Sequence, residues 1–350
     1  MKIRENTILT LDQYINEALY NKKMGYYMKN NPFGNGGDYI TSPNISILFS
    51  EMIAIWIISF WQNIKSPKKF NLIELGAGNG EMIKQILTTF NNFPKFKKCC
   101  KTYIFEKSNY LKKIQKKKLK NKNVHWLKNL NQTTNLPSIF IANEFFDALP
   151  VKQFTKLKKK WYERKVQFKK KNSPEFINIL TNIKTLDKEI GFKISHNQKF
   201  IEYSPLTNIY LKIIANKIKK NGGGILIIDY GYLGKNMKNT LQSISKHRYN
   251  NVLDNFGKSD ITYGINFNLI ERIIKKFQLK ISGITSQKKF LLNLGILQRA
   301  EIISKNLPFS KKADIYFRIK RLIDENSMGE LFKVMFATKK NIKFQTGFKN

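Results

Sequence analysis

The chain has 350 residues, 42% of them hydrophobic and 13% aromatic, which is enough for a large packed core and excludes a chain that is disordered throughout. Its net charge is +39, yet only seven of its 63 basic residues are arginine. Because proteins that read nucleic acids favour arginine, this balance indicates a lysine-coated surface and gives no sign of a specific nucleic-acid interface.

Cysteine and histidine are scarce. Cys99 and Cys100 are adjacent and the three histidines lie far apart, so we expect neither a disulfide framework nor a metal site. The first residues lack the apolar segment of a signal peptide, and we expect a cytoplasmic protein. The most apolar segment, 45–64, is interrupted by Glu51 and is too short to span a bilayer. It is expected to be buried within the chain or to pair with a second copy in a homodimer.

Helical and strand patterns alternate along the chain. The first half of the chain predicts a helix after Thr10, a loop over 25–46, a helix over 45–64, and a strand, glycine turn and helix over 71–90. A strand over 101–106, a helix over 109–120, a strand over 138–146 and a β-hairpin over 152–171 follow. The rest predicts a helix over 205–220, a strand over 225–232, a polar loop over 232–266, a helix over 267–277, and strands at 279–286 and 331–340. This order favours an α/β fold with a largely parallel sheet.

A glycine-rich turn follows the first apolar strand of that sheet. The stretch ELGAGNGE places Gly76, Gly78 and Gly80 directly before a helix. Glycine lets the backbone turn sharply and approach a ligand, and the amides of the next helix point toward that ligand. The spacing differs from that of a dinucleotide fold, and Glu81 would repel a pyrophosphate. We therefore expect an uncharged or cationic ligand, and S-adenosyl-L-methionine, with its positive sulfonium, is such a ligand.

Two carboxylates stand at the ends of neighbouring strands. Glu106 ends the strand TYIFE, where it can accept hydrogen bonds from both hydroxyls of a ribose. Such bonds contribute about 1.5–3 kcal/mol each, so Glu106→Ala is expected to lower cofactor affinity about tenfold or more. Glu74 is expected to hold the cofactor ammonium or the amides of the glycine turn. The glycines alone would fit an ordinary tight turn, but with these carboxylates a cofactor site is favoured.

A second polar group follows the strand IFIA. Asn143, Glu144 and Asp147 come just after the strand end, and Asp229 follows another strand. In an open α/β sheet, ligands bind at the carboxyl ends of the strands. Two carboxylates with two aromatic residues, Phe145 and Phe146, suit a cationic substrate group, which the carboxylates can orient and the aromatic rings can stack on. The alternative is a helix N-terminus capped by Asn143 or Asp147, with the aromatic residues in the core.

Several longer stretches carry a family resemblance. In chain order they are GYYM…NPFGNGGDYITSPNIS (25–46), ELGAGNG (74–80), ANEFFDALPVKQF (142–154), WYERKV (161–166), GGILIIDYGY (223–232), LGILQRAE (294–301) and MGELFKVMFATK (328–339). Together they resemble the MidA family of class I S-adenosylmethionine-dependent methyltransferases, which includes mitochondrial complex I assembly factors and bacterial relatives. The resemblance covers nearly the whole chain.

The resemblance implies a Rossmann-like core over 69–350, preceded by N-terminal helices and a cofactor-covering loop over 1–68. It adds an inserted lobe over about 151–200 and a substrate loop over about 232–266. The implied activity is protein arginine methylation of a complex I subunit of the 49-kDa type. The cofactor motif matches at the three glycines and Glu106, and the loop GGDYITSP adds Asp38, Thr41 and Ser42 as expected cofactor contacts. Asn143 is expected to face the cofactor, and Glu144 and Asp147 the substrate, with Asp229 beside them.

The chain departs from the family at a few positions. Its turn Ala77–Glu81 stands where relatives tend to have Pro-Gly-Arg-Gly-Thr, and Asn44 stands where Glu is common. Gly264 and Asn266 replace the usual His and Asp, which puts substrate specificity in doubt and leaves cofactor binding intact. Two alternatives to arginine methylation stay open. One is an RNA or small-molecule methyltransferase, and the other is an assembly chaperone without turnover.

Overall fold

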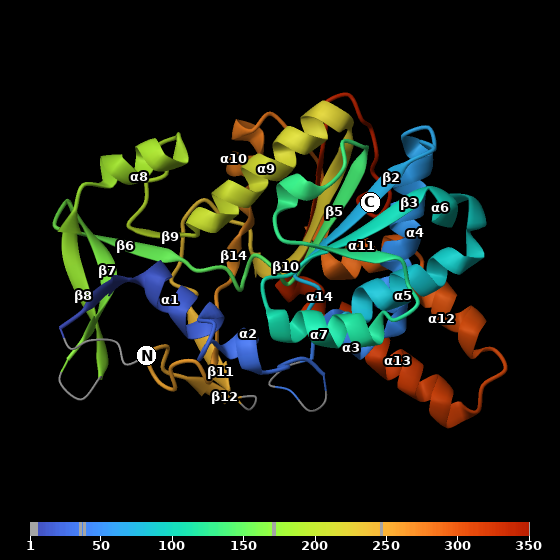
Figure 1. Ribbon diagram of the computed structural model, residues 1–350, viewed down its shortest axis with the longest axis horizontal. Helices are drawn as coiled ribbons and strands as arrows, with labels where there is room; N and C mark the ends of the chain where they lie inside the picture. Colours follow the sequence, from blue (N-terminus) through green and yellow to red (C-terminus); the bar gives the residue numbers. More distant parts are fainter. Residues whose placement is uncertain (1–5, 35–36, 38–39, 170–172, 246–247, 350) are drawn as a thin grey trace.

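A central sheet of eight strands organises the computed structural model, which describes residues 6–34, 37, 40–169, 173–245 and 248–349 (Figure 1). The strand order is β15-β16-β10-β5-β2-β3-β4, with β14 paired to β10. All neighbouring pairs are parallel except those made by β16, which runs antiparallel to β10 and β15. The strands are β2 (Phe70–Leu75), β3 (Cys100–Phe105), β4 (Val124–Leu127), β5 (Ser138–Asn143), β10 (Gly223–Tyr232), β14 (Ile265–Asn266), β15 (Lys280–Ser286) and β16 (Phe332–Thr338). The predicted α/β class is confirmed.

Helices cover both faces of this sheet. Alternation along each strand sends Leu72 to one face and Ile73 to the other, and each joins a separate buried cluster. One cluster contains α4 (Ile47–Asn63), α5 (Glu81–Thr89), α6 (Pro94–Cys99), α11 (Gln287–Asn293), α12 (Ile296–Ser304) and α13 (Phe309–Ile323). The other contains α9 (Pro205–Asn221) and α10 (Phe267–Lys276).

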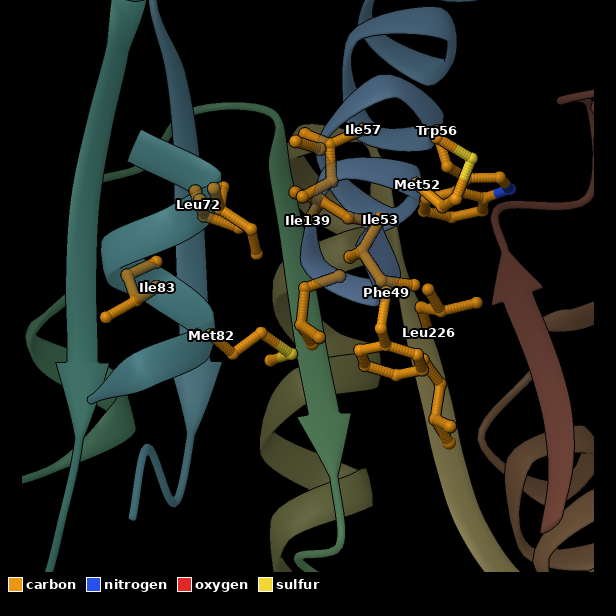
Figure 2. Packing of buried hydrophobic residues seen from close by; sticks show 14 of the residues in the cluster. Phe49, Met52, Ile53, Trp56, Ile57, Leu72, Met82, Ile83, Ile139 and Leu226 are labelled. Atoms are coloured by element: carbon orange, nitrogen blue, oxygen red, sulfur yellow. The ribbon is translucent and has the colours of Figure 1, made fainter. Parts of the chain in front are cut away.

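The apolar helix predicted over 45–64 is α4, and it is buried within the chain. Figure 2 shows Phe49, Ile53 and Ile57 of α4 lying over Ile139 of β5 and Leu226 of β10. The indole of Trp56 donates a hydrogen bond to the backbone oxygen of Thr346 at 2.9 Å. Of the two expectations for this helix, burial in the core is therefore the one that the structure bears out.

The inserted lobe forms a sheet of its own together with the N-terminal strand. Its elements are β6 (Lys152–Leu157), β7 (Lys160–Phe168), β8 (Pro174–Thr181), α8 (Ile183–Ile190) and β9 (Phe200–Tyr203). The predicted hairpin is β6–β7, and its two-residue turn consists of Lys158 and Lys159, both with positive φ. β1 (Ile8–Thr10) pairs with β7, which brings α1 (Leu11–Tyr20) beside the lobe (Figure 1). The start of the chain and the lobe are thus one structural unit.

The segment 232–266 is more ordered than the loop that the sequence predicted. It contains a three-stranded antiparallel sheet of β11 (Gln242–Ser245), β12 (Arg248–Asn250) and β13 (Asp260–Thr262), and it ends in β14. These strands are two to four residues long and rich in polar residues, so they lack the alternating pattern by which strands are found. The remaining short elements are α2 (Tyr26–Lys29), α3 (Ser42–Ile45), η1 (Phe90–Asn92), α7 (Asn109–Lys118), η2 (Leu130–Gln132) and α14 (Met328–Leu331).

Candidate functional site

The glycine turn lies between β2 and α5, at the carboxyl end of β2. Gly76, Gly78 and Gly80 all have positive φ, at 65°, 51° and 77°, a conformation that glycine adopts readily. A Cβ at Gly76 would lie 2.8 Å from the ring of Phe145, and one at Gly78 would lie 3.2 Å from the ring of Phe33. Both the backbone conformation and the close approach of two aromatic rings therefore require glycine here.

Glu106, the first residue after β3, is fixed by the protein on both oxygens. Its Oε1 accepts from the amide of Ser108 at 2.8 Å, and its Oε2 accepts from Nε2 of Gln115 at 3.1 Å. The same Nε2 donates to the backbone oxygen of Gly78 at 2.8 Å, and Oε1 of Gln115 accepts from the indole of Trp126. Gln115 is fully buried on α7. It therefore ties the glycine turn to Glu106 with one amide group.

Two of the departures from the family pattern contact each other. Nδ2 of Asn79, in the glycine turn, donates to Oδ1 of Asn44 at 2.9 Å. Asn44 in turn donates to Oγ1 of Thr41 at 2.7 Å. Asn79 also accepts from the amide of Glu81 and so closes the turn. This chain thus joins the glycine turn and the covering loop through two neutral amides.

The turn after β5 presents the second polar group. Glu144 has φ 49°, and its Oε1 accepts from the amide of Ser42 and from Nδ2 of Asn143, each at 3.3 Å. Asp229, at the end of β10, accepts from the amides of Phe146 and Asp147 at 3.1 and 3.4 Å. It also accepts from the amide of Tyr230. The geometry makes Asp229 the anchor of this turn, with its carboxylate aimed at backbone amides.

An aromatic cleft connects the two polar groups. Gly76, Gly78, Glu106, Glu144 and Asp147 all line it. The aromatic residues of its wall are Tyr20, Tyr27, Phe33, Phe105, Phe145 and Tyr210. The structure therefore brings the predicted cofactor turn, Glu106 and the two predicted substrate carboxylates to one cavity.

The covering loop contacts a residue of the cleft wall, Glu144, through α3. The amide of Ser42 contacts Glu144, and Oγ of Ser42 donates to Oε1 of Gln287 at 3.4 Å. Thr41 is buried beside it, with its hydroxyl accepting from Asn44. Asp38, the third residue predicted from this loop, lies outside the described residues. Cofactor contacts of all three stay predictions.

Comparison with known proteins identifies the family. Residues 52–285, about two thirds of the chain, match the family model described as "Putative S-adenosyl-L-methionine-dependent methyltransferase". The chain belongs to this family. The methyltransferase is 28% identical to "Protein arginine methyltransferase NDUFAF7, mitochondrial" of Xenopus laevis over 95% of the chain and 81% of that protein. Its human counterpart is also 28% identical, over 99% of the chain and 83% of that protein.

Two solved structures share the fold. A Burkholderia thailandensis protein bound to S-adenosyl-homocysteine superimposes with a TM-score of 0.80 at 22% identity, covering 98% of this chain and 89% of that one. The native crystal structure of a Burkholderia thailandensis protein gives 0.81 at 23% identity, covering 97% and 89%. With the strand order above, this confirms the predicted class I methyltransferase fold.

The site of the methyltransferase fits S-adenosyl-L-methionine, the cofactor of its family. Of the buried oxygens that have no hydrogen-bond partner within the described residues, three lie at this site: Oε2 of Glu74, Oδ1 of Asn143 and Oδ1 of Asp147. Buried acceptors without partners are costly, and a ligand with ammonium and hydroxyl groups would satisfy them. When bound, the cofactor supplies a methyl group on a positive sulfonium. Glu106 and the glycine turn would hold the ribose, and Glu74 and Asn143 the polar tail.

The charges of the site are unusual for so basic a protein. Six of the chain's 24 acidic residues gather here, namely Glu74, Glu106, Glu144, Asp147, Asp229 and Asp260. Burial, followed by the charge of Glu106, raises the pKa of Glu74 to about 8. Burial also raises the pKa of Glu144 to about 7. For Asp147 and Asp229, burial and the neighbouring carboxylates raise the pKa well above the ordinary value. Bound positive charge would relieve this repulsion.

Sequence reasoning missed part of the site. Asp260, on β13, is buried and accepts a hydrogen bond from the hydroxyl of Tyr27 at 2.8 Å. It lies close enough to Asp147 to raise the pKa of that carboxyl. Gln115, Tyr20 and Tyr210 were also missed, because they come from segments with no motif of their own. A buried glutamine and a row of tyrosines carry no sequence signal of a site.

Two positions that the sequence flagged have local structural roles. Oδ1 of Asn266 accepts from the amide of Leu269 at 2.8 Å and so caps α10, while its Nδ2 donates to the backbone oxygen of Gly234. The amide of Gly264 donates to Oγ1 of Thr240 at 2.9 Å. Within the described residues, no three or more His, Cys, Asp or Glu side chains are arranged so that they could hold one metal ion. The helices of this part of the chain are all too short or too polar to span a bilayer.

Proposed function

We propose that the methyltransferase transfers its methyl group to an arginine side chain of a protein, and that this protein is a respiratory complex I-type subunit. The observation that carries the proposal is the pair Glu144 and Asp147, which line the same cleft as the glycine turn and Glu106. A guanidinium is a planar cation with several N–H donors, and carboxylates are its best partners. The names of the relatives support the same substrate class.

In this reaction the carboxylates of the site contribute more by positioning the guanidinium than by activating it as a nucleophile. Methyl transfer is an in-line displacement: the bond from sulfur to the methyl carbon breaks, one from a guanidinium nitrogen to that carbon forms, and that nitrogen loses a proton. Glu144 and Asp147 would hold the guanidinium within about 3–3.5 Å of the methyl group, which is the range of near-attack geometry. Phe145 lines the cleft between them and offers a ring for the guanidinium to stack on. With a pKa near 7, Glu144 can accept the released proton at neutral pH.

The acidic cleft also argues against an RNA substrate. The net charge of +39 favours binding to nucleic acid in general. A phosphate backbone entering this cleft, however, would meet Glu144 and Asp147 at low dielectric. The cleft therefore favours a cationic substrate group, although the basic outer surface attracts anions.

One labelling experiment separates the three readings. The purified protein is incubated with methyl-labelled cofactor and a lysate of its own organism, and Glu144→Gln with Asp147→Asn serves as the control. Label on arginine in one protein band, identified by mass spectrometry as a complex I-type subunit, is the expected result. Label in RNA or in a small molecule would contradict the proposal, and cofactor binding without any label would favour an assembly chaperone.

A further inference from the structure

The α12–α13 hairpin exposes apolar side chains to an unusual degree. The described residues expose sixteen large apolar side chains, and five of these fall within 297–317. They are Leu297, Ile302, Leu307, Phe309 and Phe317, with 39%, 68%, 37%, 85% and 65% of their surface exposed. Figure 1 shows the hairpin projecting from the edge of the molecule, at the side away from the inserted lobe. Scattered exposed apolar residues need no explanation, but a cluster does.

The outer face of α13 is separate from the face that packs on the core. Ile319 and Leu322 are buried in the same cluster as α4. Phe309 and Phe317 are eight residues apart and so lie on one stripe of the helix, with the exposed Ala313 between them. Core packing therefore does not account for the two phenylalanines, because the helix already buries a different stripe.

Basic side chains surround these rings. Between 302 and 323 the chain has six basic residues and one acidic residue, a net charge of +5. The acidic residue, Asp314, is paired with Arg318 at 2.8 Å. Besides Arg318, the exposed basic residues of α13 and of the turn before it are Lys305, Lys311, Lys312, Lys320 and Arg321. We call this set, with Ile302, Leu307, Phe309 and Phe317, the hairpin surface.

We propose that the hairpin surface attaches the protein peripherally to an anionic lipid bilayer. Exposed aromatic and aliphatic side chains would enter the interfacial region, and the lysines would lie among the headgroups with their stems along the apolar boundary. Each basic residue near an anionic leaflet adds about 1 kcal/mol of attraction, which would orient the hairpin toward the bilayer.

Other occupants fit less well. The cores of protein interfaces are depleted of lysine, and this surface has four. A second copy would bring another net charge of +39 against it. Single-stranded nucleic acid would use the charges and the rings, but it gives Ile302 and Leu307 no apolar partner. Of these occupants, only an anionic bilayer offers apolar contact to the aliphatic side chains and negative charge to the basic ones.

The surface also lies one element from the candidate site. Nη1 of Arg318 donates to the backbone oxygen of Ile45, in α3, at 3.3 Å. Gln287 accepts from Ser42 of α3 and donates to the backbone oxygen of Leu322 in α13. Attachment through the hairpin surface would thus orient the covering segment, and with it the mouth of the cleft, relative to the bilayer.

The test is co-sedimentation of the whole protein with vesicles at physiological ionic strength. Vesicles of phosphatidylcholine with phosphatidylglycerol should bind the protein, and vesicles of phosphatidylcholine alone should bind it much less. Phe309→Ser with Phe317→Ser should lower binding to the anionic vesicles about tenfold or more, since each ring loses its transfer from water. Leu180→Ser with Tyr249→Ser, on residues that are 59% and 77% exposed elsewhere, should leave binding within about twofold.

The phenylalanine variant separates insertion from adsorption by lysine alone. If it binds anionic vesicles as well as the unchanged protein does, the rings do not insert and the proposal is wrong. The proposal is also wrong if sedimentation shows that the unchanged protein is a dimer and the phenylalanine variant a monomer, because the rings then contact a second copy. It is wrong as well if neither the unchanged protein nor the variant binds vesicles and the variant loses affinity for single-stranded RNA. A Phe309→Trp reporter quenched by brominated acyl chains would support it directly. None of these readouts depends on methyl transfer, so the two proposals fail separately.

Discussion

The carboxylate of Asp229, at the end of β10, accepts a hydrogen bond from the backbone amide of Phe146, in the turn after β5, at 3.1 Å. β5 and β10 are parallel neighbours, so one side chain joins two strand ends across the sheet. The turn that it fixes has an unfavourable conformation at Glu144, with φ 49°. A strained turn persists only where its surroundings hold it, and Asp229 supplies that support. The candidate substrate carboxylates thus owe their position to a third carboxylate beneath them.

Asp229→Ala is expected to release this turn. It removes the acceptor of three backbone amides, each of which is left without a partner at a cost of about 1–3 kcal/mol. We expect a fall in melting temperature and a loss of turnover of about 100-fold or more. Asp229→Asn keeps one acceptor oxygen and should recover part of both. Equal damage from the two variants would show that charge, and not positioning, is the role of Asp229.

The sequence predicted the parts of the site that lie within one motif. The glycine turn, Glu106 and the group from Asn143 to Asp147 each follow an apolar strand directly, so their placement at the sheet edge is a local consequence of the pattern. Gln115 has no such marker, because its role depends on where α7 lies against the glycine turn. The same holds for Tyr20, which reaches the cleft from α1 and donates to the backbone oxygen of Ala148.

The segment 232–266 shows the other limit of sequence patterns. Its strands are short and polar, and they hold together through contacts with distant parts of the chain. Tyr27 donates to Asp260, and the amide of Tyr263 donates to the backbone oxygen of Asp147 at 3.1 Å. Contacts between residues more than 100 positions apart leave no periodic trace, so the sequence indicated only a polar loop.

Gln115→Ala is expected to weaken cofactor binding without unfolding the protein. The substitution removes a donor from Glu106 and from the backbone oxygen of Gly78, so both are free to shift. We expect the dissociation constant for S-adenosyl-homocysteine to rise about tenfold, comparable with the loss of one hydrogen bond to a charged group. Titration calorimetry measures this. Gln85→Ala, on the outer side of α5, is the matched control and should bind normally.

Glu144→Gln with Asp147→Asn should reduce turnover and spare cofactor binding. These side chains would orient the guanidinium, so we expect turnover on the identified substrate to fall about 100-fold. Turnover of the unchanged protein should rise with pH through about 7 as Glu144 ionises, and the variant should lose this rise. Full turnover in the variant would show that these carboxylates are not the substrate clamp.

The unliganded protein should lose stability as the pH rises. The pKa of Glu74 is raised from 4.5 to about 8, so above pH 4.5 the folded state holds a proton that the unfolded state has released. Stability from this group is fully present below the unfolded pKa and is lost as pH rises through the folded value. Glu74→Gln should flatten this fall by a few kcal/mol between about pH 5 and 9, while Glu301→Gln on the surface should not. Parallel melting curves for the two variants would contradict the raised pKa.

Gly76→Ala tests the close approach between the glycine turn and the ring of Phe145, in the turn after β5. The new methyl carbon would lie 2.8 Å from the ring of Phe145, so either the turn or the ring must move. Gly295→Ala is the matched control, because Gly295 has φ 83° in the left-handed region and a new Cβ there would lie 3.5 Å from the nearest atom, an ordinary contact. The control should show only the backbone strain, about 1 kcal/mol. Gly76→Ala should cost more stability and lower cofactor affinity as well, measured by thermal melting and calorimetry. If the two variants behave alike, Phe145 is free to move and does not set the shape of the cleft.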